Sequence, residues 1–369
     1  MKKVLFLIHD LGHGGAEKVL VNLVNYMDQT QFDITVMALF GGGVNEQFLK
    51  PHVHYKTVFQ KSFPGNSHIM KLFSPRQLHK WFIKEHYDIE VSYLEGPSAR
   101  VISGCPDVDT KLVSWIHVEQ KNAKKAAEAF RSVKEAVKCY NRFHKGVAVS
   151  ETVKKDFMSI LPISVPMQVL YNTNESQKIY DLSRETLEYQ LDNNVVNLVG
   201  VGKLVQSKGF DRQLRIVKKL RDENYPVHLY ILGVGHKQQE LEQYIHENQL
   251  DENVTLLGYQ TNPYKYVAKC DLFVCASHAE GFSTAATEAL IVGTPVCTVE
   301  VSGMKEMLGE NSEWGLIMEN SEEGLYQGIK RLLDAPNLLA HYKEKAVERG
   351  KTFSTENTVR TVEEMLMSL

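Results

Sequence analysis

The feature that most constrains the fold is an alternation of short apolar runs with segments of helical periodicity, which recurs along the whole chain. Short apolar runs bounded by polar or glycine residues are typical of buried strands, whereas apolar residues three and four apart are typical of helices. Residues 4–8 illustrate the first pattern and residues 16–27 the second. Because strands alternating with helices form parallel sheets covered on both faces, the sequence predicts an α/β fold with doubly wound parallel sheets.

The same alternation predicts the individual elements. We expect strands at 4–8, 32–39, 89–94, 111–116, 146–149, 196–201, 227–232, 254–257, 271–275 and 295–299. We expect helices at 16–27, 74–86, 122–143, 211–223, 237–247, 284–292, 322–334 and 337–349.

A chain of 369 residues is long enough for two such domains. We assign residues 1–170 to a first Rossmann-like domain, 171–194 to a polar linker and 195–352 to a second Rossmann-like domain. The remaining residues, 353–369, contain a helix that we expect to cross back to the first domain.

Composition narrows the class of protein. Apolar residues make up 43% of the chain and charged residues 24%, which is typical of a folded globular protein. No apolar run approaches the roughly 18 residues of a transmembrane helix, and the run at 4–8 is too short for a signal peptide. The five cysteines are scattered and form no CxxC pair, which disfavours disulfides and a zinc site. We therefore predict a cytoplasmic protein.

The charge differs between the two halves. Residues 1–170 contain 22 Lys and Arg against 16 Asp and Glu, whereas residues 171–369 contain 20 against 29. The predicted helix at 122–143 contributes much of the basic excess, and its basic residues cluster within about one quadrant. This face is either a solvated surface with internal ion pairs or a contact with an anionic membrane at the inner face of the cell. The charge is too modest and too poor in interleaved aromatics for nucleic-acid binding.

Three loops at predicted strand ends carry candidate binding residues, because ligands of such sheets lie at the carboxyl ends of the strands. The first is Asp10-Leu-Gly-His-Gly-Gly-Ala-Glu, whose glycines allow close approach of a ligand to a helix start. The second, Gly-Lys-Leu-Val-Gln-Ser-Lys-Gly-Phe-Asp at 202–211, places two lysines where a diphosphate would need positive charge. Each loop taken alone is also compatible with an ordinary turn or a solvated surface.

The third loop contains two glutamates, Glu280 and Glu288, around a predicted helix start. Carboxylates accept hydrogen bonds from neighbouring hydroxyl groups, so the pair suits a sugar and a ribose. The backbone N–H groups of Phe282, Ser283 and Thr284 suit phosphate oxygens.

Together these motifs resemble glycosyltransferase family 4, the retaining group with the two-domain GT-B fold. The resemblance rests on the Glu-x7-Glu pair, on the Gly-Lys-Leu…Lys-Gly-x-Asp pattern at 202–211 and on the Gly-Gly-Ala-Glu sequence at 14–17. It implies two Rossmann-like domains that face a central cleft. It also implies a nucleotide-sugar donor in the second domain.

The resemblance implies roles for individual residues. Lys203 and Lys208 would hold the donor diphosphate, Glu288 the ribose, and Glu280 the transferred sugar, and His117 would lie near that sugar. We assign catalytic roles to His117, Glu280, Lys203 and Lys208. The complete set of predicted donor-binding residues is Gly14, Gly15, Gly202, Lys203, Lys208, Gly258, Tyr259, Glu280, Gly281, Phe282, Ser283, Thr284 and Glu288. Asp10 and Glu95 are predicted acceptor contacts.

The predicted activity is a metal-independent, retaining transfer of a hexose (glucose, galactose or an N-acetylhexosamine) from a UDP-sugar to a growing, lipid-linked bacterial surface glycan such as capsule or lipopolysaccharide. No cofactor is expected, and Asp107-Val-Asp109 sits at a predicted turn rather than at a metal site. Alternatives on the same fold are a UDP-sugar 2-epimerase, a sugar phosphorylase and a non-catalytic partner subunit. An epimerase would convert the nucleotide-sugar without an acceptor.

Overall fold

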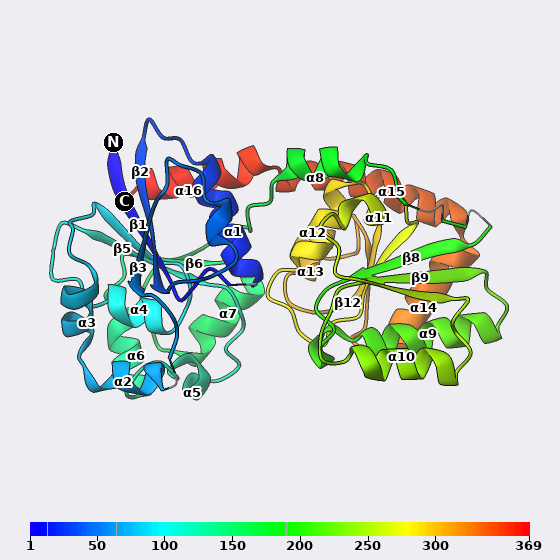
Figure 1. The fold of residues 1–369 in the computed structure, drawn as a ribbon, viewed down its shortest axis with the longest axis horizontal. Coiled ribbons are helices and arrows are strands. Elements are labelled where there is room, and N and C mark those ends of the chain that lie inside the picture. The colour runs from blue at the N-terminus through cyan, green and yellow to red at the C-terminus, as the bar shows by residue number, and fades with distance from the viewer. Residues whose placement is uncertain (13, 64, 189–190, 193) are drawn as a thin grey trace. The chain divides into compact units, whose positions relative to one another are not determined.

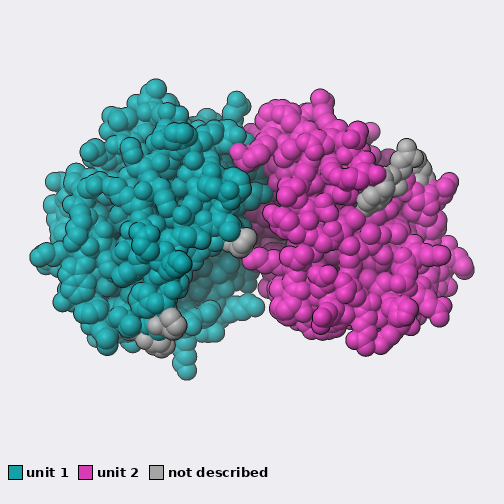
Figure 2. All heavy atoms as spheres, viewed as in Figure 1, with its two compact units in different colours: residues 1–174, 355–369 teal, residues 175–354 magenta. Residues whose placement is uncertain are grey.

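The computed structural model describes residues 1–12, 14–63, 65–188, 191–192 and 194–369. The chain divides into two compact units, residues 1–174 together with 355–369 (unit 1) and residues 175–354 (unit 2) (Figure 1; Figure 2). Each unit is built around one sheet in which all pairings are parallel. The predicted fold, two doubly wound parallel-sheet domains, is confirmed.

Unit 1 contains a seven-stranded sheet in the order β3-β2-β1-β4-β5-β6-β7. Its strands are β1 (Lys2–Ile8), β2 (Phe32–Phe40), β3 (His54–Phe59), β4 (Ile89–Ser92), β5 (Lys111–Ile116), β6 (Lys145–Ala148) and β7 (Met167–Val169). Its helices are α1 (Gly15–Tyr26), α2 (Asn66–Leu72), α3 (Pro75–Phe82), α4 (Pro97–Ile102), α5 (Ala123–Ala126), α6 (Val133–Tyr140), α7 (Glu151–Ile160) and α16 (Thr355–Met367), with a 3-10 turn, η1 (Glu46–Phe48).

Unit 2 contains a six-stranded sheet in the order β10-β9-β8-β11-β12-β13. Its strands are β8 (Val196–Val201), β9 (Val227–Leu232), β10 (Val254–Gly258), β11 (Leu272–Cys275), β12 (Val296–Val299) and β13 (Leu316–Met318). Its helices are α8 (Ser176–Ser183), α9 (Phe210–Asp222), α10 (Gln238–Glu247), α11 (Tyr264–Val267), α12 (Thr284–Ile291), α13 (Met304–Leu308), α14 (Glu322–Asp334) and α15 (Pro336–Gly350), with the 3-10 turns η2 (Gln206–Lys208) and η3 (Lys351–Phe353).

In both sheets the strand order reverses beside the first strand, and loops lie at this point. In unit 1 the first strand, β1, pairs with both β2 and β4, and in unit 2 β8 pairs with both β9 and β11. The chain therefore leaves the neighbouring strands of each sheet in opposite directions, which opens a crevice at their carboxyl ends. These two edges hold the loops that the sequence singles out.

The predicted helix at 122–143 is wrong, because the segment forms two short helices, α5 and α6. Ser132 ends the continuity: its side chain accepts a hydrogen bond from the Glu135 N–H at 3.1 Å and caps α6. The Glu135 carboxylate also accepts from the Arg131 N–H at 2.6 Å. Serine three residues before glutamate is a helix-start signal, so the break was readable in the sequence. The single basic helical face that we predicted does not exist.

The last helix returns to unit 1. α16 packs against α1, and Lys2 Nζ donates to the Leu366 carbonyl at 3.1 Å. Residues 175–188 of the predicted linker belong to unit 2 and contain α8, whereas residues 189, 190 and 193 of that segment lie outside the described residues. Among the helices that the structure describes, every one is too short or too polar to cross a bilayer.

Candidate functional site

In unit 2, the loops after β8 and β11 bring a lysine and a glutamate together. Lys208 Nζ lies 2.6 Å from Glu280 Oε1, and the Ser277 hydroxyl donates to the same oxygen at 2.6 Å. The Lys208 side chain is 31% exposed and that of Glu280 is 11% exposed, so the pair is shielded but reachable. Lys208, Ser277, Glu280 and Ser283 line one small pocket. The predicted meeting of these two loops is therefore observed.

Glycines set the approach of these loops. Gly209 has a φ of +66°, and a Cβ there would lie 2.1 Å from the Ala276 carbonyl oxygen. Any side chain at position 209 would therefore push the lysine loop away from β11. Gly233, after β9, is packed in the same way, because its Cβ would lie 1.8 Å from the Gly202 carbonyl oxygen. A Cβ at Gly202 would make only ordinary contacts, so the steric requirement falls on Gly233, which our prediction omitted.

The start of α12 forms one wall of the pocket. Ser283 is the N-cap, and its hydroxyl accepts from the Ala286 N–H at 3.3 Å. The N–H groups of the first helical residues, beginning at Thr284, point out of the helix end and carry its partial positive charge. Phe282 is buried and packs its ring 5.9 Å from that of Phe353, so its side chain is a core contact, while Gly281 is partly exposed.

Glu288 lies one turn further along α12. The Tyr264 hydroxyl donates to Glu288 Oε1 at 3.1 Å. Tyr264 begins α11 and is buried, which fixes the carboxylate at the edge of the sheet. Tyr264 could not be selected from the sequence, because it lies in a short helix that hydrophobic periodicity does not reveal.

Lys203, Gly258 and Tyr259 occupy the same edge of the sheet. The Lys203 side chain is exposed and makes no hydrogen bond or ion pair within the described part of the chain. Gly258 has a φ of +67°, and its carbonyl accepts from the Gly233 N–H at 2.8 Å. Tyr259 is 72% exposed directly after β10. This edge therefore combines an unpaired cation, a paired cation and an exposed aromatic ring.

The edge of the unit 1 sheet has a different chemistry. The carboxylate of the partly buried Glu95 accepts from the His117 N–H at 3.0 Å and from Gln120 Nε2 at 3.1 Å. Burial raises the pKa of Glu95, and burial lowers the pKa of His117 to about 3, so the imidazole is neutral at physiological pH. Gln120 was not predicted from the sequence. Its side chain closes the network by joining Glu95 to the loop after β5.

His117 Nε2 is buried and has no hydrogen-bond partner among the described residues. The rings of Tyr93 and Trp115 lie with their centroids 4.8 Å and 6.3 Å from the imidazole and limit its rotation. A buried polar atom without a partner costs about 1–3 kcal/mol, and such atoms in native proteins often mark a binding function. His117 is therefore a candidate ligand contact at this edge, and the neighbouring Ser114 Oγ and Trp115 Nε1 of β5 are also buried without a partner among the described residues.

The glycine-rich loop after β1 is held by local contacts. Asp10 Oδ1 accepts from the Gly12 N–H at 2.7 Å and Asp10 Oδ2 lies 2.7 Å from His9 Nδ1. Gly14 is the N-cap of α1 and lacks a side-chain cap, while a Cβ on Gly15 would meet nothing within 4 Å. The first helical residue of α1 thus has open space beside it, whereas the Glu17 carboxylate lies against Gly14, where a Cβ would be 1.8 Å from Glu17 Oε2. His13 of this motif lies outside the described residues.

The Asp107-Val-Asp109 sequence forms a turn. Asp107 Oδ1 accepts from the Asp109 N–H at 3.0 Å, and Asp107 Oδ2 lies 2.8 Å from His86 Nδ1. The hydrogen bond from the Asp109 N–H, and after it the nearby His86, lower the pKa of Asp107. Both carboxylate oxygens of Asp107 are thus committed to protein contacts, in keeping with the predicted turn.

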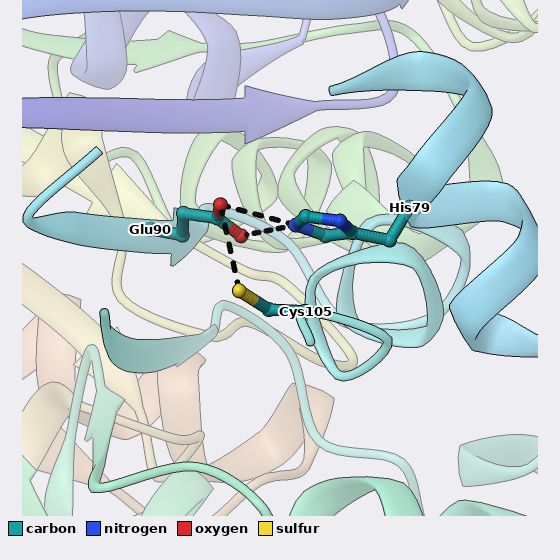
Figure 3. Close-up of side chains that lie close together, drawn as sticks. All are labelled: His79, Glu90 and Cys105. Carbon is teal, nitrogen blue, oxygen red and sulfur yellow. Dashed lines mark hydrogen bonds and ion pairs between the residues drawn. The ribbon is translucent and has the colours of Figure 1, made fainter. Parts of the chain in front are cut away.

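Among the described residues, one group of His, Cys and acidic side chains has the proximity of metal ligands: His79, Glu90 and Cys105 in unit 1 (Figure 3). His79 Nε2 lies 2.8 Å and 3.0 Å from the two Glu90 oxygens, closer than the roughly 3.3 Å between two tetrahedral ligands each about 2.0 Å from zinc. Burial raises the pKa of Cys105 to about 11, so the thiol keeps its proton and donates to Glu90. The donor set fits a buried hydrogen-bonded cluster that ties α3 to β4.

Comparison with known proteins adds the family. The profile described as Glycosyltransferase Family 4 matches residues 13–173, and that described as Glycosyl transferases group 1 matches residues 185–349. A Campylobacter jejuni protein, N-acetylgalactosamine-N,N'-diacetylbacillosaminyl-diphospho-undecaprenol 4-alpha-N-acetylgalactosaminyltransferase, is 28% identical over 375 residues, covering 98% of each chain. A lipopolysaccharide core biosynthesis glycosyltransferase of Rhizobium meliloti is 27% identical over 193 residues, covering 52% of this chain and 54% of that protein.

Solved structures show the same fold. The Anabaena HepE protein, crystallised in complex with UDP, superposes with a TM-score of 0.77 at 19% identity, and the match covers 100% of both chains. Each family profile matches one half of the chain, and each half contains one parallel sheet with its strand-end loops. The chain therefore belongs to the GT-B glycosyltransferases of family 4, group 1, with relatives in capsule and lipopolysaccharide biosynthesis.

Proposed function

We propose that this protein transfers a hexose from a UDP-sugar to a lipid-linked surface glycan, with retention of configuration and without a metal ion. The observation that carries the proposal is the Lys208–Glu280 pair beside the N-terminus of α12. A cation and free backbone N–H groups suit a diphosphate, and a neighbouring carboxylate suits sugar hydroxyls.

The leaving group explains why these charges matter. When the bond between the sugar and the diphosphate breaks, negative charge grows on the diphosphate oxygen, and donors already in place stabilise it without reorganisation. Lys203 has no competing partner among the described residues, and Lys208 can exchange its bond to Glu280 for one to phosphate. We propose that these two lysines replace a divalent cation in this role.

Retention of configuration follows from the reaction path that we propose. The acceptor hydroxyl approaches the sugar carbon from the side that the diphosphate leaves, and its proton passes to the departing phosphate oxygen. This path needs no protein nucleophile. Glu280 would orient the sugar, and Glu288, held by Tyr264, would bind the ribose hydroxyls.

The unit 1 edge would serve the sugar and the acceptor. We propose that a sugar hydroxyl completes the hydrogen bonding of His117 Nε2, whose neutral ring can act as donor or acceptor. Glu95 is a positioning residue in this proposal, because its two carboxylate oxygens accept from the His117 N–H and from Gln120.

The acceptor class comes from the relatives. The printed name of the Campylobacter jejuni protein specifies an acceptor linked to diphospho-undecaprenol, and the match spans 98% of both chains. HepE was also crystallised with UDP-glucose, which supports a UDP-sugar donor. We therefore place the reaction at a membrane face where lipid-linked glycans are built.

The test is a transfer assay with a panel of UDP-sugars, with and without undecaprenyl-diphosphate-linked saccharides. We expect a product only when both a UDP-hexose and a lipid-linked acceptor are present, with the new linkage in the donor's anomeric configuration. Conversion of the UDP-sugar without any acceptor would instead indicate an epimerase. Inversion of the anomeric centre would overturn the proposed path.

A further inference from the structure

A basic, apolar surface on unit 1 lies apart from the pockets described above. It is formed by α2 and α3, and we call it the α2–α3 surface; its outward residues are Ile69, Leu72, Arg76, Lys80 and Trp81. Ile69, Leu72 and Trp81 are 46%, 73% and 44% exposed. Large apolar side chains exposed together are a sign of an interaction site. The Phe73 and Trp81 ring centroids lie 4.8 Å apart, which joins the two helices into one surface.

The charge of this region is one-sided. Residues 47–84 contain seven Lys and Arg residues and no Asp or Glu. Three of these basic residues, Arg76, Lys80 and Lys84, are exposed on or directly after α3. The surface therefore matches a partner that is apolar inside and negatively charged at its face.

The two helices are held firmly from the inside. The buried Arg100 guanidinium donates to the Met70 and Phe73 carbonyls at 2.8 Å and 2.7 Å. Arg131 donates to the Lys71 and Leu72 carbonyls at 2.6 Å and 2.8 Å. These bonds satisfy the carbonyl groups at the end of α2. Arg131, which we placed on the basic face of the predicted helix at 122–143, instead supports α2.

α3 is fixed by its opposite face. His79 points inward to Glu90, as Figure 3 shows, and both side chains are buried. Residues 77 and 81 are one helical turn apart from each other and face away from His79, so this bond leaves Trp81 at the surface. The exposure of Trp81 is therefore a consequence of a specific buried contact rather than of loose packing.

The surface adjoins the carboxyl edge of the sheet. The Phe63 ring, just before α2, packs 5.8 Å from Phe40 and 5.5 Å from Phe59, the last residues of β2 and β3. This is the edge of unit 1 that contains the Glu95–His117 network. Pro64 of this segment lies outside the described residues.

We propose that the α2–α3 surface docks unit 1 on an anionic lipid bilayer. Leu72, Ile69 and Trp81 would enter the interfacial region, where tryptophan is favoured, and Arg76, Lys80 and Lys84 would contact the anionic headgroups. The choice of a bilayer as partner rests on the proposed function, since a lipid-linked acceptor is presented at such a surface.

The test is binding of the full-length protein to phosphatidylglycerol-containing vesicles and to pure phosphatidylcholine vesicles. We expect sedimentation with the anionic vesicles only, weakened about tenfold between about 0.05 M and about 0.5 M salt. Trp81 provides a second readout. It is the exposed tryptophan of the three, because Trp115 is buried and Trp314 partly so, and its emission should shift to shorter wavelength on binding.

Two paired variants separate the apolar from the ionic part. Leu72→Ser with Trp81→Ser should weaken vesicle binding about tenfold or more. Arg76→Gln with Lys80→Gln should weaken it about tenfold and reduce the salt dependence. Matched controls elsewhere on the surface, Met158→Ser with Val347→Ser and Lys155→Gln with Lys343→Gln, should change binding less than about twofold. Thermal melting and UDP affinity confirm that each variant is folded.

Absence of wild-type binding to anionic vesicles would overturn the inference, as would equal losses in the test and control variants. Equal binding to neutral and anionic vesicles would reject the ionic part. Vesicle binding requires no sugar donor. Retained vesicle binding in a protein that transfers no sugar would contradict the proposed function and leave the docking surface intact.

Discussion

The carboxyl edges of the two sheets both carry polar side chains at strand ends, but these side chains differ in charge and in burial. The unit 2 edge uses charged side chains that are partly exposed, such as Lys208 with Glu280. The unit 1 edge uses a buried network in which His117 is neutral. Under the proposed function, unit 2 would recognise charge, and unit 1 would recognise hydroxyl groups through shape and the unpartnered His117 Nε2.

The largest effect is expected at Glu280, where the two functions of the unit 2 edge meet. Glu280→Gln removes the charge that pairs with Lys208, replaces the charged acceptor of the Ser277 hydroxyl with a neutral one, and weakens the proposed hydrogen bonding to the sugar. We expect kcat/KM to fall on the order of 100-fold, or about 3 kcal/mol. Steady-state transfer kinetics provide the measurement, with exposed Glu319→Gln as control. A loss below about threefold would remove Glu280 from the catalytic site.

The second prediction separates the two lysines. Lys208→Ala should weaken UDP binding about tenfold to hundredfold, because a charged hydrogen bond contributes about 1.5–3 kcal/mol. Lys203→Ala should also weaken it, whereas Lys203→Arg keeps the charge and should retain most of the affinity. Calorimetric titration with UDP measures both, and Lys343→Ala is the matched control. Unchanged affinity in folded Lys208→Ala would show that unit 2 does not bind the diphosphate through this loop.

The third prediction concerns the neutral histidine of unit 1. Its folded pKa of about 3 lies below the unfolded value near 6.5, so below that pH only the unfolded state takes up the proton. His117 therefore costs stability increasingly as the pH falls from about 6.5 to about 3, with a penalty of about 2 kcal/mol at pH 5. His117→Gln should lose less stability than wild type between about pH 7.5 and about pH 5.

Urea unfolding followed by tryptophan fluorescence measures this difference, since Trp115 lies beside His117. His246→Gln, at a histidine whose side chain is 87% exposed, should keep the wild-type dependence. If the free energy of unfolding changes with pH equally in wild type and in His117→Gln, His117 is not held in a buried neutral state. Glu95 has the opposite sign, because its raised pKa makes its contribution largest at low pH and smaller as the carboxyl ionises.

The smallest effect is expected from metal removal. If lysines and the start of α12 stabilise the leaving diphosphate, EDTA should change the transfer rate by less than about twofold. Activity lost with EDTA and restored by magnesium or manganese would show that the charge of the unit 2 edge is insufficient alone. The unit 2 edge would then require a bound divalent cation in addition to its lysines.

The central strands were predictable from the sequence, and so was the edge strand β10, but the other three edge strands were not. β5, β8 and β9 have the predicted bounds, because central strands buried on both faces read as continuous apolar runs. β3, β7 and β13 were missed, and each is the outermost strand at an end of its sheet. Edge strands are partly exposed, as the burial of β3 and β7 shows, and this weakens their apolar pattern.

The site residues also fall into a group that was predictable from the sequence and a group that was not. Lys208, Glu280 and Glu288 were predicted because each carries its chemistry in a motif of fixed spacing. Gln120, Tyr264 and Gly233 were not, because their roles depend on partners 25, 24 and 31 residues away that only folding brings near. The predicted basic helix is wrong because Ser132 caps a new helix, α6, and so interrupts the basic pattern.

The sequence by itself determined the two parallel sheets, the loops at their carboxyl ends and the charged residues that those loops carry, because hydrophobic periodicity and glycine positions are local properties. Tertiary structure decided what each charge does. Burial keeps His117 neutral. Hydrogen bonds between residues far apart in the chain make Glu95 a support for the loop after β5 and join Arg131 to the end of α2. The reason is physical: protonation and hydrogen-bond partnership depend on desolvation and on neighbours far away in the chain, and no local pattern records them.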